Sequence, residues 1–259
     1  MERVFEEVDI LESLDSDRVT RMIGAGYTDF TQGNNVKEVY HIVLEYINGC
    51  ELFDFICITG SFSEDVCRYF FHQLVEGIEY IHEQGISHRD LKTQNILLDK
   101  RYNLIIADFG IATMKEINMT TAGTQVYAAP ELLERWNQTD PDPYIGKIID
   151  IFGLGVILFM MRTNDRPFEK AEVKDFYYQH FYKNKHKRFW ECHSEFRSSG
   201  YFSKDFKDLI NQLLAPNPTH RLSLSEIKEH PWYNVSILGS HYYIFGCSRL
   251  ARSILYITS

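Results

Sequence analysis

Positive charge, cysteine pairs and long apolar runs are all scarce in this sequence. The 27 lysines and arginines are outnumbered by 36 acids, and the net charge of −9 argues against a nucleic-acid partner because its phosphates would be repelled. The one basic cluster, Lys183–Arg188, is expected to be a solvated loop or helix face, with peptide or phosphate docking as the alternative. The longest apolar run, Ile148–Met161, is interrupted by Asp150 and falls short of the roughly 20 residues of a membrane span. It therefore predicts a core helix and no membrane partner.

The five cysteines are scattered, and no two of them form a C-x-x-C pair. This pattern predicts reduced thiols, as in a cytoplasmic or nuclear protein, rather than a disulfide framework or a zinc site. The acidic N-terminus lacks the apolar segment of a signal peptide, which agrees with that location. With 259 residues and 44% hydrophobic content, the chain is long enough for one sizeable core or for two lobes of unequal size.

Apolar periodicity and turn residues predict the main elements. We expect a helix at 2–14, strands at 19–27 and 39–47 with a polar loop between them, a short helix at 52–58 and a long helix ending near Gly85. Ser61 and Glu64 have the spacing of a capping box for the long helix. The Gly24–Gly26 segment is expected to lie in a turn after the first helix.

Polar residues gather around two short apolar runs between Ile86 and Gly110. The runs Ile96–Leu98 and Leu104–Ala107 predict a small buried hairpin. Magnesium prefers oxygen ligands and usually shares them with phosphates, so carboxylate, amide and ammonium groups in one cleft suit a metal and phosphate site. The hairpin would bring four such side chains together: Asp90, Lys92, Asn95 and Asp108.

Three motifs in this order carry a family resemblance: HRD-x-K-x-x-N at 88–95, DFG at 108–110 and AAPE at 128–131. The sequence resembles the protein kinases over roughly residues 2–233. Lys92 and Thr124 resemble the serine/threonine branch, and HPWY at 230–233 is most similar to the calcium/calmodulin-dependent group. The resemblance implies an α+β, two-lobe fold with a small β-rich N lobe and a mainly α-helical C lobe.

The resemblance also implies domain boundaries. Residues 1–47 would form a truncated N lobe, 48–233 the C lobe, and 234–259 a loosely docked tail of unknown role. No G-x-G-x-x-G occurs, and the chain begins six residues before Glu7, which aligns with the family's inward-pointing glutamate. The lysine that pairs with this glutamate therefore has no position, and ATP is expected to bind weakly. The missing strands would leave Val39–Ile47 with an exposed sheet edge, open to a partner.

The resemblance assigns a role to each site residue. Asp90 would be the catalytic base, Lys92 would neutralise charge on the γ-phosphate, and Asn95 and Asp108 would hold Mg²⁺. For Glu51 it implies contact with ribose or a basic substrate residue, although a solvated carboxylate at a helix start explains it equally well. The residues implied around adenine are Leu44 as gatekeeper, the backbone of Glu45 and Ile47, and Leu97 as the floor.

Other residues are implied as supports or regulators. His88 and Phe109 would stack with Leu11, Gly110 would permit the turn after Asp108, and Asp150 would brace the catalytic loop. Glu131 would pair with Arg221. Thr120 or Thr121 would be phosphorylated and the phosphate would pair with Arg89, unless both are ordinary loop threonines. Gln94 and Gln125 depart from the family, which predicts weaker selection for arginine before the target residue and an altered peptide-docking loop.

Two functions from different classes fit these observations. The first is an ATP- and Mg²⁺-dependent protein kinase that acts on serine or threonine in protein substrates. The second is a pseudokinase or interaction scaffold that keeps the fold but turns over little nucleotide. The intact Asp90, Lys92, Asn95 and Asp108 favour the first, and the missing lysine and glycine loop favour the second.

Overall fold

The computed structural model of the chain describes residues 2–33, 35–136, 138 and 142–235. The predicted tail, apart from residues 234 and 235, lies outside the described residues, as does Cys247. The helices and strands, in chain order, are α1 (Glu2–Ser13), β1 (Met22–Gln32), β2 (Asn35–Leu44), β3 (Gly49–Glu51), α2 (Leu52–Thr59), α3 (Glu64–Glu83), β4 (Ile96–Asp99), β5 (Leu104–Ile106), β6 (Ile117–Asn118), α4 (Pro130–Trp136), β7 (Tyr144–Ile145), α5 (Gly146–Thr163), α6 (Tyr178–Tyr182), α7 (His186–Ser194), α8 (Lys204–Leu213) and α9 (Leu224–Glu229).

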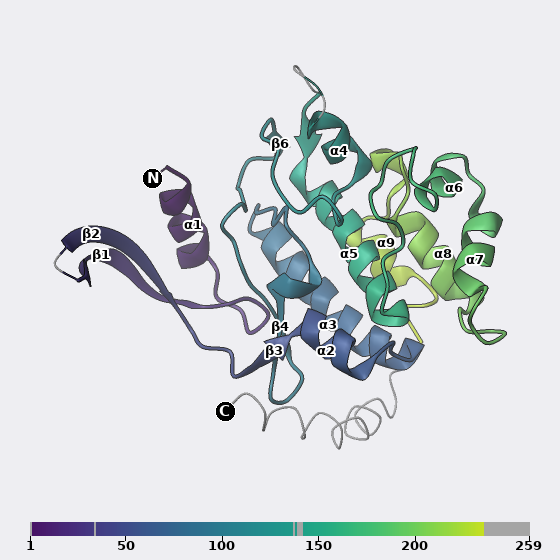
Figure 1. Cartoon of the computed structure of the whole chain (residues 1–259), viewed down its shortest axis with the longest axis horizontal. Helices are drawn as coiled ribbons and strands as arrows, with labels where there is room; N and C mark the ends of the chain where they lie inside the picture. The colour runs from purple at the N-terminus through teal and green to yellow at the C-terminus, as the bar shows by residue number, and fades with distance from the viewer. Residues whose placement is uncertain (1, 34, 137, 139–141, 236–259) are drawn as a thin grey trace.

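The elements form two parts of unequal size. Figure 1 shows α1 and the long β1–β2 ribbon on one side and the helices from α3 to α9 on the other, with β3 and β4 where the two parts meet. The strands form two-stranded β1–β2, three-stranded β3–β4–β5 and two-stranded β6–β7 sheets, all antiparallel. This arrangement confirms the predicted α+β, two-lobe fold.

Two long helices, α3 and α5, form the centre of the helical part. Apolar residues recur every three or four positions along α3, and Phe70, Leu74 and Ile78 are fully buried. Helix α5 is buried along almost its whole length, which confirms the core helix predicted from the apolar run. At Gly155 a Cβ would lie 2.8 Å from a methyl group of Leu214, so the glycine allows α5 to approach the end of α8 closely.

The ribbon differs from its prediction. Gly24–Gly26 lies inside β1 rather than in a turn, and the residues expected in a polar loop extend both strands, with Tyr27 opposite Tyr40. The chain reverses at Gly33, whose φ of 63° suits a tight turn. Threonine, tyrosine, phenylalanine and valine favour strands. Pairing of these residues between β1 and β2 outweighs the preference of Gly24 and Gly26 for a turn.

The start of α3 was also mispredicted. Ser63, not Ser61, caps the helix, and its hydroxyl accepts a hydrogen bond from the backbone of Val66. The carboxylate of Glu64 instead accepts hydrogen bonds from Ser203 and from the indole of Trp232. A long-range contact therefore uses the side chain that the capping-box spacing had assigned to the helix start.

None of the helices in the described part of the chain combines the length and apolar character needed to cross a bilayer. Its cysteines are free thiols, with Cys67 buried and Cys50 and Cys57 exposed.

Candidate active site

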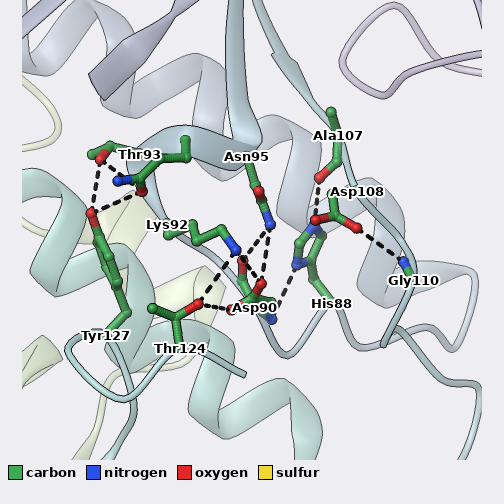
Figure 2. Close-up of polar contacts among 11 residues, drawn as sticks. His88, Asp90, Lys92, Thr93, Asn95, Ala107, Asp108, Gly110, Thr124 and Tyr127 are labelled. Atoms are coloured by element: carbon green, nitrogen blue, oxygen red, sulfur yellow. Dashed lines mark hydrogen bonds and ion pairs between the residues drawn. The ribbon is translucent and has the colours of Figure 1, made fainter. Parts of the chain in front are cut away.

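The β4–β5 hairpin brings the two polar segments together, as predicted. Ile96 pairs with Ile106 and Leu98 with Leu104, and all four are buried. The backbone of Ala107 donates a 2.9 Å hydrogen bond to the carbonyl of Asn95, which ties the exit of the hairpin to its entrance. Figure 2 shows the side chains of Asp90, Lys92 and Asn95 grouped together, with His88 between Asp90 and Asp108.

The carboxylate of Asp90 is held by three donors (Figure 2). Its Oδ2 accepts from Lys92 Nζ at 2.6 Å and from Asn95 Nδ2 at 3.3 Å. Its Oδ1 accepts from Thr124 Oγ1 at 2.7 Å. Gly123 has a φ of 109°, and a Cβ there would lie 2.8 Å from the carbonyl oxygen of Arg89, so this glycine lets the segment approach Asp90. Together these donors fix the orientation of the Asp90 carboxylate.

The ring nitrogens of His88 each contact the backbone, and these two contacts define its tautomer. The backbone N–H of Asp90 donates to His88 Nδ1 at 3.2 Å, and His88 Nε2 lies 3.0 Å from the carbonyl oxygen of Ala107. A backbone N–H can only donate, so Nδ1 is the acceptor and Nε2 carries the proton. The ring also packs on Phe109, with centroids 5.2 Å apart; His88 is fully buried, and Phe109 belongs to the hydrophobic core that includes Leu11.

Asp150, on α5, anchors the loop that contains His88 and Arg89. Its Oδ2 accepts from the backbone of His88 at 2.9 Å and its Oδ1 accepts from the backbone of Arg89 at 2.8 Å. His82 Nε2 lies 2.9 Å from Oδ2, a contact that the sequence did not indicate because His82 has no motif around it. These contacts hold Arg89 in the left-handed region, with a φ of 64°, a conformation that costs about 1–3 kcal/mol for a residue other than glycine.

Asp108 and Asn95 present oxygen atoms to the cleft. Asp108 is exposed, has a φ of 65°, and accepts a 3.3 Å hydrogen bond from the backbone of Gly110 through Oδ1. Asn95 uses its amide nitrogen on the backbone of Asp90 at 3.0 Å. Among the described residues its amide oxygen has no hydrogen-bond partner, so this oxygen is available to a ligand. No cluster of three or more His, Cys, Asp or Glu with metal-binding geometry occurs in the described ranges, and a Mg²⁺ bound here would complete its shell with phosphate oxygens and water.

Glu7 lies near Asp108. Its carboxylate oxygens are 3.7 and 4.0 Å from the position of a Cβ at Gly110, and no ion pair to Glu7 is formed by the described residues. Partial burial, together with the charge of Asp108, raises the pKa of Glu7. The neighbouring Glu6 instead accepts a 2.8 Å hydrogen bond from Thr113, which fastens α1 to the segment after the DFG turn.

The Arg89 side chain bonds to several residues around Thr120. Its guanidinium donates to the carbonyl of Ile111, to Asn118 Oδ1 at 3.2 Å, to Tyr144 at 3.2 Å and to Thr120 Oγ1 at 3.0 Å. Of the two threonines predicted to be modified, Thr120 therefore contacts Arg89, whereas among the described residues no side-chain hydrogen bond joins Arg89 to Thr121.

Arg135 in α4 was missed by the sequence arguments. It donates a 2.6 Å hydrogen bond to the carbonyl of Met119 and lies over the ring of Tyr144, 5.3 Å from its centroid. Its side chain is 4% exposed, and its Nε and Nη1 have no hydrogen-bond partner among the described residues. No motif marks Arg135, because its contacts with Met119 and Tyr144 arise only when α4 packs beside β7.

Glu131 and Arg221 form the predicted ion pair. Nη1 and Nη2 of Arg221 donate to the two carboxylate oxygens of Glu131, each at 2.6 Å. The same guanidinium donates to the carbonyls of Ala215 and Ile148. This bidentate contact joins α4 to the segment before α9 and to the start of α5.

The residues predicted to surround adenine do not all line one cavity. Leu97 pairs with Glu51 across the β3–β4 ladder, whereas Leu44 is 40% exposed at the end of β2. Glu45 accepts from the backbone of Arg21 at 2.8 Å. A cavity of about 610 Å³ includes Glu45 and Ile47 but none of Leu44, Leu97 and Asp108 among its lining residues. This cavity is therefore separate from the cleft of Asp90 and Asp108.

Comparison with known proteins gives a consistent answer. The family model described as protein kinase domain matches residues 1–233. CBL-interacting serine/threonine-protein kinase 8 of Arabidopsis thaliana is 39% identical over 197 residues, which cover 74% of this chain and 40% of the relative. CBL-interacting protein kinase 11 of Oryza sativa subsp. japonica is 37% identical over 203 residues, which cover 76% of this chain and 37% of the relative. The chain thus spans about two fifths of the length of these relatives. From the match over most of its length and from these relatives, the chain belongs to the protein kinase domain family, in its serine/threonine branch.

Proposed function

We propose that the chain transfers the γ-phosphate of ATP to serine or threonine hydroxyls of protein substrates. The observation that carries the proposal is the position of Asp90, whose carboxylate is held between Lys92 and Thr124 at 2.6 and 2.7 Å. Phosphoryl transfer depends on positioning and charge neutralisation, and an oriented carboxylate beside an ammonium supplies both.

The residues divide the work as follows. The acceptor hydroxyl donates its hydrogen bond to Asp90, and as its oxygen attacks the γ-phosphorus, the proton passes to the carboxylate and ADP leaves. Lys92 lies close enough to Asp90 to neutralise charge on the transferred group. The amide oxygen of Asn95 and the carboxylate of Asp108 would hold Mg²⁺, which supplies neutralisation of the phosphate oxygens when bound. Leu97, Glu51 and the 44–47 segment would contact the nucleoside.

A transfer assay with an internal fold control tests this function. The purified chain is given Mg·ATP and a mixed serine/threonine peptide substrate, and phosphopeptide formation is measured. Asp90→Ala should lower the rate by at least about 10³-fold, since it removes the base, while its melting temperature stays close to that of the parent. Transfer that persists in Asp90→Ala would contradict the assigned role.

Phosphorylation of Thr120 is the proposed activating modification. A phosphate on Thr120 would add about two negative charges next to Arg89 and Arg135, both of which are buried. New charge-assisted hydrogen bonds there would order the segment that delivers Thr124 to Asp90. A phosphopeptide map of active chain in which Thr120 is unmodified would remove this part of the proposal.

The alternative function, an interaction scaffold with little turnover, is favoured by the β1–β2 ribbon. In the described part of the chain, these strands pair only with each other. Ile23, Phe30 and Val36 are 69, 57 and 63% exposed. Open strand edges with apolar side chains favour pairing with a strand from a partner. No Mg·ATP-dependent thermal shift and no transfer by the parent, together with self-association that Phe30→Lys and Val36→Lys abolish, would favour this function.

A further inference from the structure

A basic patch lies at the turn between α6 and α7. It consists of Lys183, Lys185, Lys187 and Arg188, and the proposed function gives these residues no role. All four are exposed, and Figure 1 shows α6 and α7 at the opposite end of the molecule from the β1–β2 ribbon. A solvated surface and a docking site are the two explanations of this cluster, and its contacts favour the second.

The backbone of the turn has a defined course. Lys185 donates a 2.7 Å hydrogen bond to the carbonyl of His180, and Asn184, with a φ of 54°, donates to the carbonyl of Phe181 at 2.9 Å. Beneath the turn, the buried rings of Phe181 and Phe189 pack with centroids 4.5 Å apart. The stems of the four cations therefore begin from fixed positions on one corner of the fold.

Few carboxylates compensate the charge of the patch. Arg188 pairs with Glu191 at 3.2 Å, but both side chains are largely exposed, so the pair is weak. Lys183 contacts only the neutral side chain of Gln179. The side chains of the other two lysines form no ion pair or hydrogen bond with the residues that the structure describes. Most of the positive charge is thus available to an anionic ligand.

The start of α7 adds donors to the same corner. No side chain caps this helix, and the backbone N–H groups of His186 and Lys187 have no hydrogen-bond partner in the described part of the chain. The partial positive charge of a helix start therefore lies among the lysines. Burial, followed by the charges of three of the patch cations, lowers the pKa of His180, which agrees with a positive potential at this corner.

Exposed aromatic rings border the patch. Phe176 is 57% exposed, and its ring packs edge-on against that of His180, with centroids 5.9 Å apart. Tyr182, which directly precedes the patch, is also 57% exposed. A surface that combines unpaired cations with exposed aromatic rings is complementary to a ligand that carries carboxylates and an apolar side chain.

We propose that this patch binds an acidic segment of a partner protein. Carboxylates of the segment would pair with the lysines of the patch and accept from the backbone N–H groups at the start of α7. An apolar side chain of the segment would lie on Phe176. The binding does not require phosphate transfer, so the proposal stands or falls independently of the kinase function.

A narrow peptide suits the patch better than an anionic membrane does. The chain carries a net charge of −9 although the patch is positive, so the residues outside the patch are more acidic still. An extended anionic surface would repel them, whereas a peptide that contacts only α6 and α7 avoids this repulsion.

Fluorescence anisotropy with two labelled peptides tests the proposal. In the first peptide, glutamates alternate with glycines on both sides of one phenylalanine, and in the second, glutamine replaces every glutamate. The full chain should bind the first peptide saturably and the second at least about tenfold more weakly. Raising the salt concentration from about 50 to about 200 mM should weaken binding several-fold, because exposed charges are screened over a Debye length of about 10 Å.

Charge reversal locates the contact. Lys185→Glu combined with Lys187→Glu should weaken binding of the first peptide at least about tenfold. The matched control combines Lys37→Glu with Lys100→Glu, which changes the net charge equally at two exposed lysines that form no ion pair with the described residues. The control should bind within about twofold of the parent, and Phe176→Ser should bind at least about threefold more weakly. Melting temperatures close to that of the parent confirm that each variant is folded.

Three results would overturn the proposal and leave the kinase function standing. The first is an absence of saturable binding, or equal binding of the two peptides. The second is an equal loss of affinity in the patch variant and the control variant, since only the net charge would then matter. The third is binding to phosphatidylserine vesicles that is tighter than binding to the acidic peptide and is lost in the patch variant, which would assign the patch to a membrane.

Discussion

Arg135 donates a 2.6 Å hydrogen bond to the carbonyl of Met119, the residue directly before Thr120. On the other side, Arg89 donates to the hydroxyl of Thr120 at 3.0 Å. The two side chains are buried, and neither forms an ion pair with a carboxylate in the part of the chain that the structure describes. Buried guanidinium groups without a counter-charge are costly, so this pair favours an anion between them.

The second pKa of a phosphate on Thr120 should depend on both Arg89 and Arg135. The second pKa of phosphothreonine is about 6, and two nearby guanidinium groups should lower it, because they stabilise the dianion. In chain prepared with phosphothreonine at position 120, ³¹P NMR titration should show this lowering. Arg135→Gln should raise the pKa part of the way back.

Arg188→Gln serves as the control, since the Arg188 side chain is 59% exposed and pairs with Glu191 on α7. It should leave the phosphate titration unchanged. If the phosphate titrates in the folded chain as it does in urea, the two arginines do not bind it.

The Asp150 carboxylate should be among the most sensitive single sites for stability. It is 1% exposed and accepts backbone hydrogen bonds from His88 and Arg89 and a contact from His82. Asp150→Asn replaces one acceptor oxygen by a donor, leaving a buried N–H facing another. Urea unfolding should show a loss of about 3 kcal/mol, whereas exposed Asp142→Asn should change stability by less than about 0.5 kcal/mol. A loss for Asp150→Asn no greater than for Asp142→Asn would show that the loop holds its shape without this acceptor.

The Glu131–Arg221 pair should behave as one bidentate unit. Arg221→Lys keeps the charge but loses one of the two parallel hydrogen bonds and the contacts to Ala215 and Ile148, so we expect about 2–4 kcal/mol of destabilisation. A double-mutant cycle with Glu131→Gln should give a coupling energy above about 1 kcal/mol. Strictly additive losses would mean that the pair is not coupled.

Apolar periodicity predicted the β4–β5 hairpin and the long core helices, because these depend on local sequence, and the resemblance to the protein kinases implied the Glu131–Arg221 pair. Local sequence patterns failed where contacts between distant segments decide the outcome. Glu64 bonds to Ser203 and Trp232 rather than forming a capping box with Ser61, and Gly24–Gly26 is extended because β2 pairs with it. Arg135 and Tyr178 carry no local signal, since their unpartnered polar atoms arise only from tertiary packing.

Glu7 should make the stability of the chain depend on pH in an unusual direction. Burial and the charge of Asp108 raise its pKa above the ordinary value of 4.5, so its contribution is favourable below that value and is lost as pH rises through the raised pKa. Glu7→Gln stays neutral at every pH and should therefore melt higher than the parent near neutral pH, with the difference shrinking as the pH falls toward 4.5. Glu12→Gln, at an exposed position on the same helix, is the control for the loss of one carboxylate, and its melting temperature near neutral pH should stay close to that of the parent. Melting curves of the parent and the two variants, recorded between pH 4.5 and neutral pH, measure these differences. A Glu7→Gln variant that is less stable than the parent near neutral pH would show that a cation, rather than Asp108, dominates the surroundings of the Glu7 carboxylate.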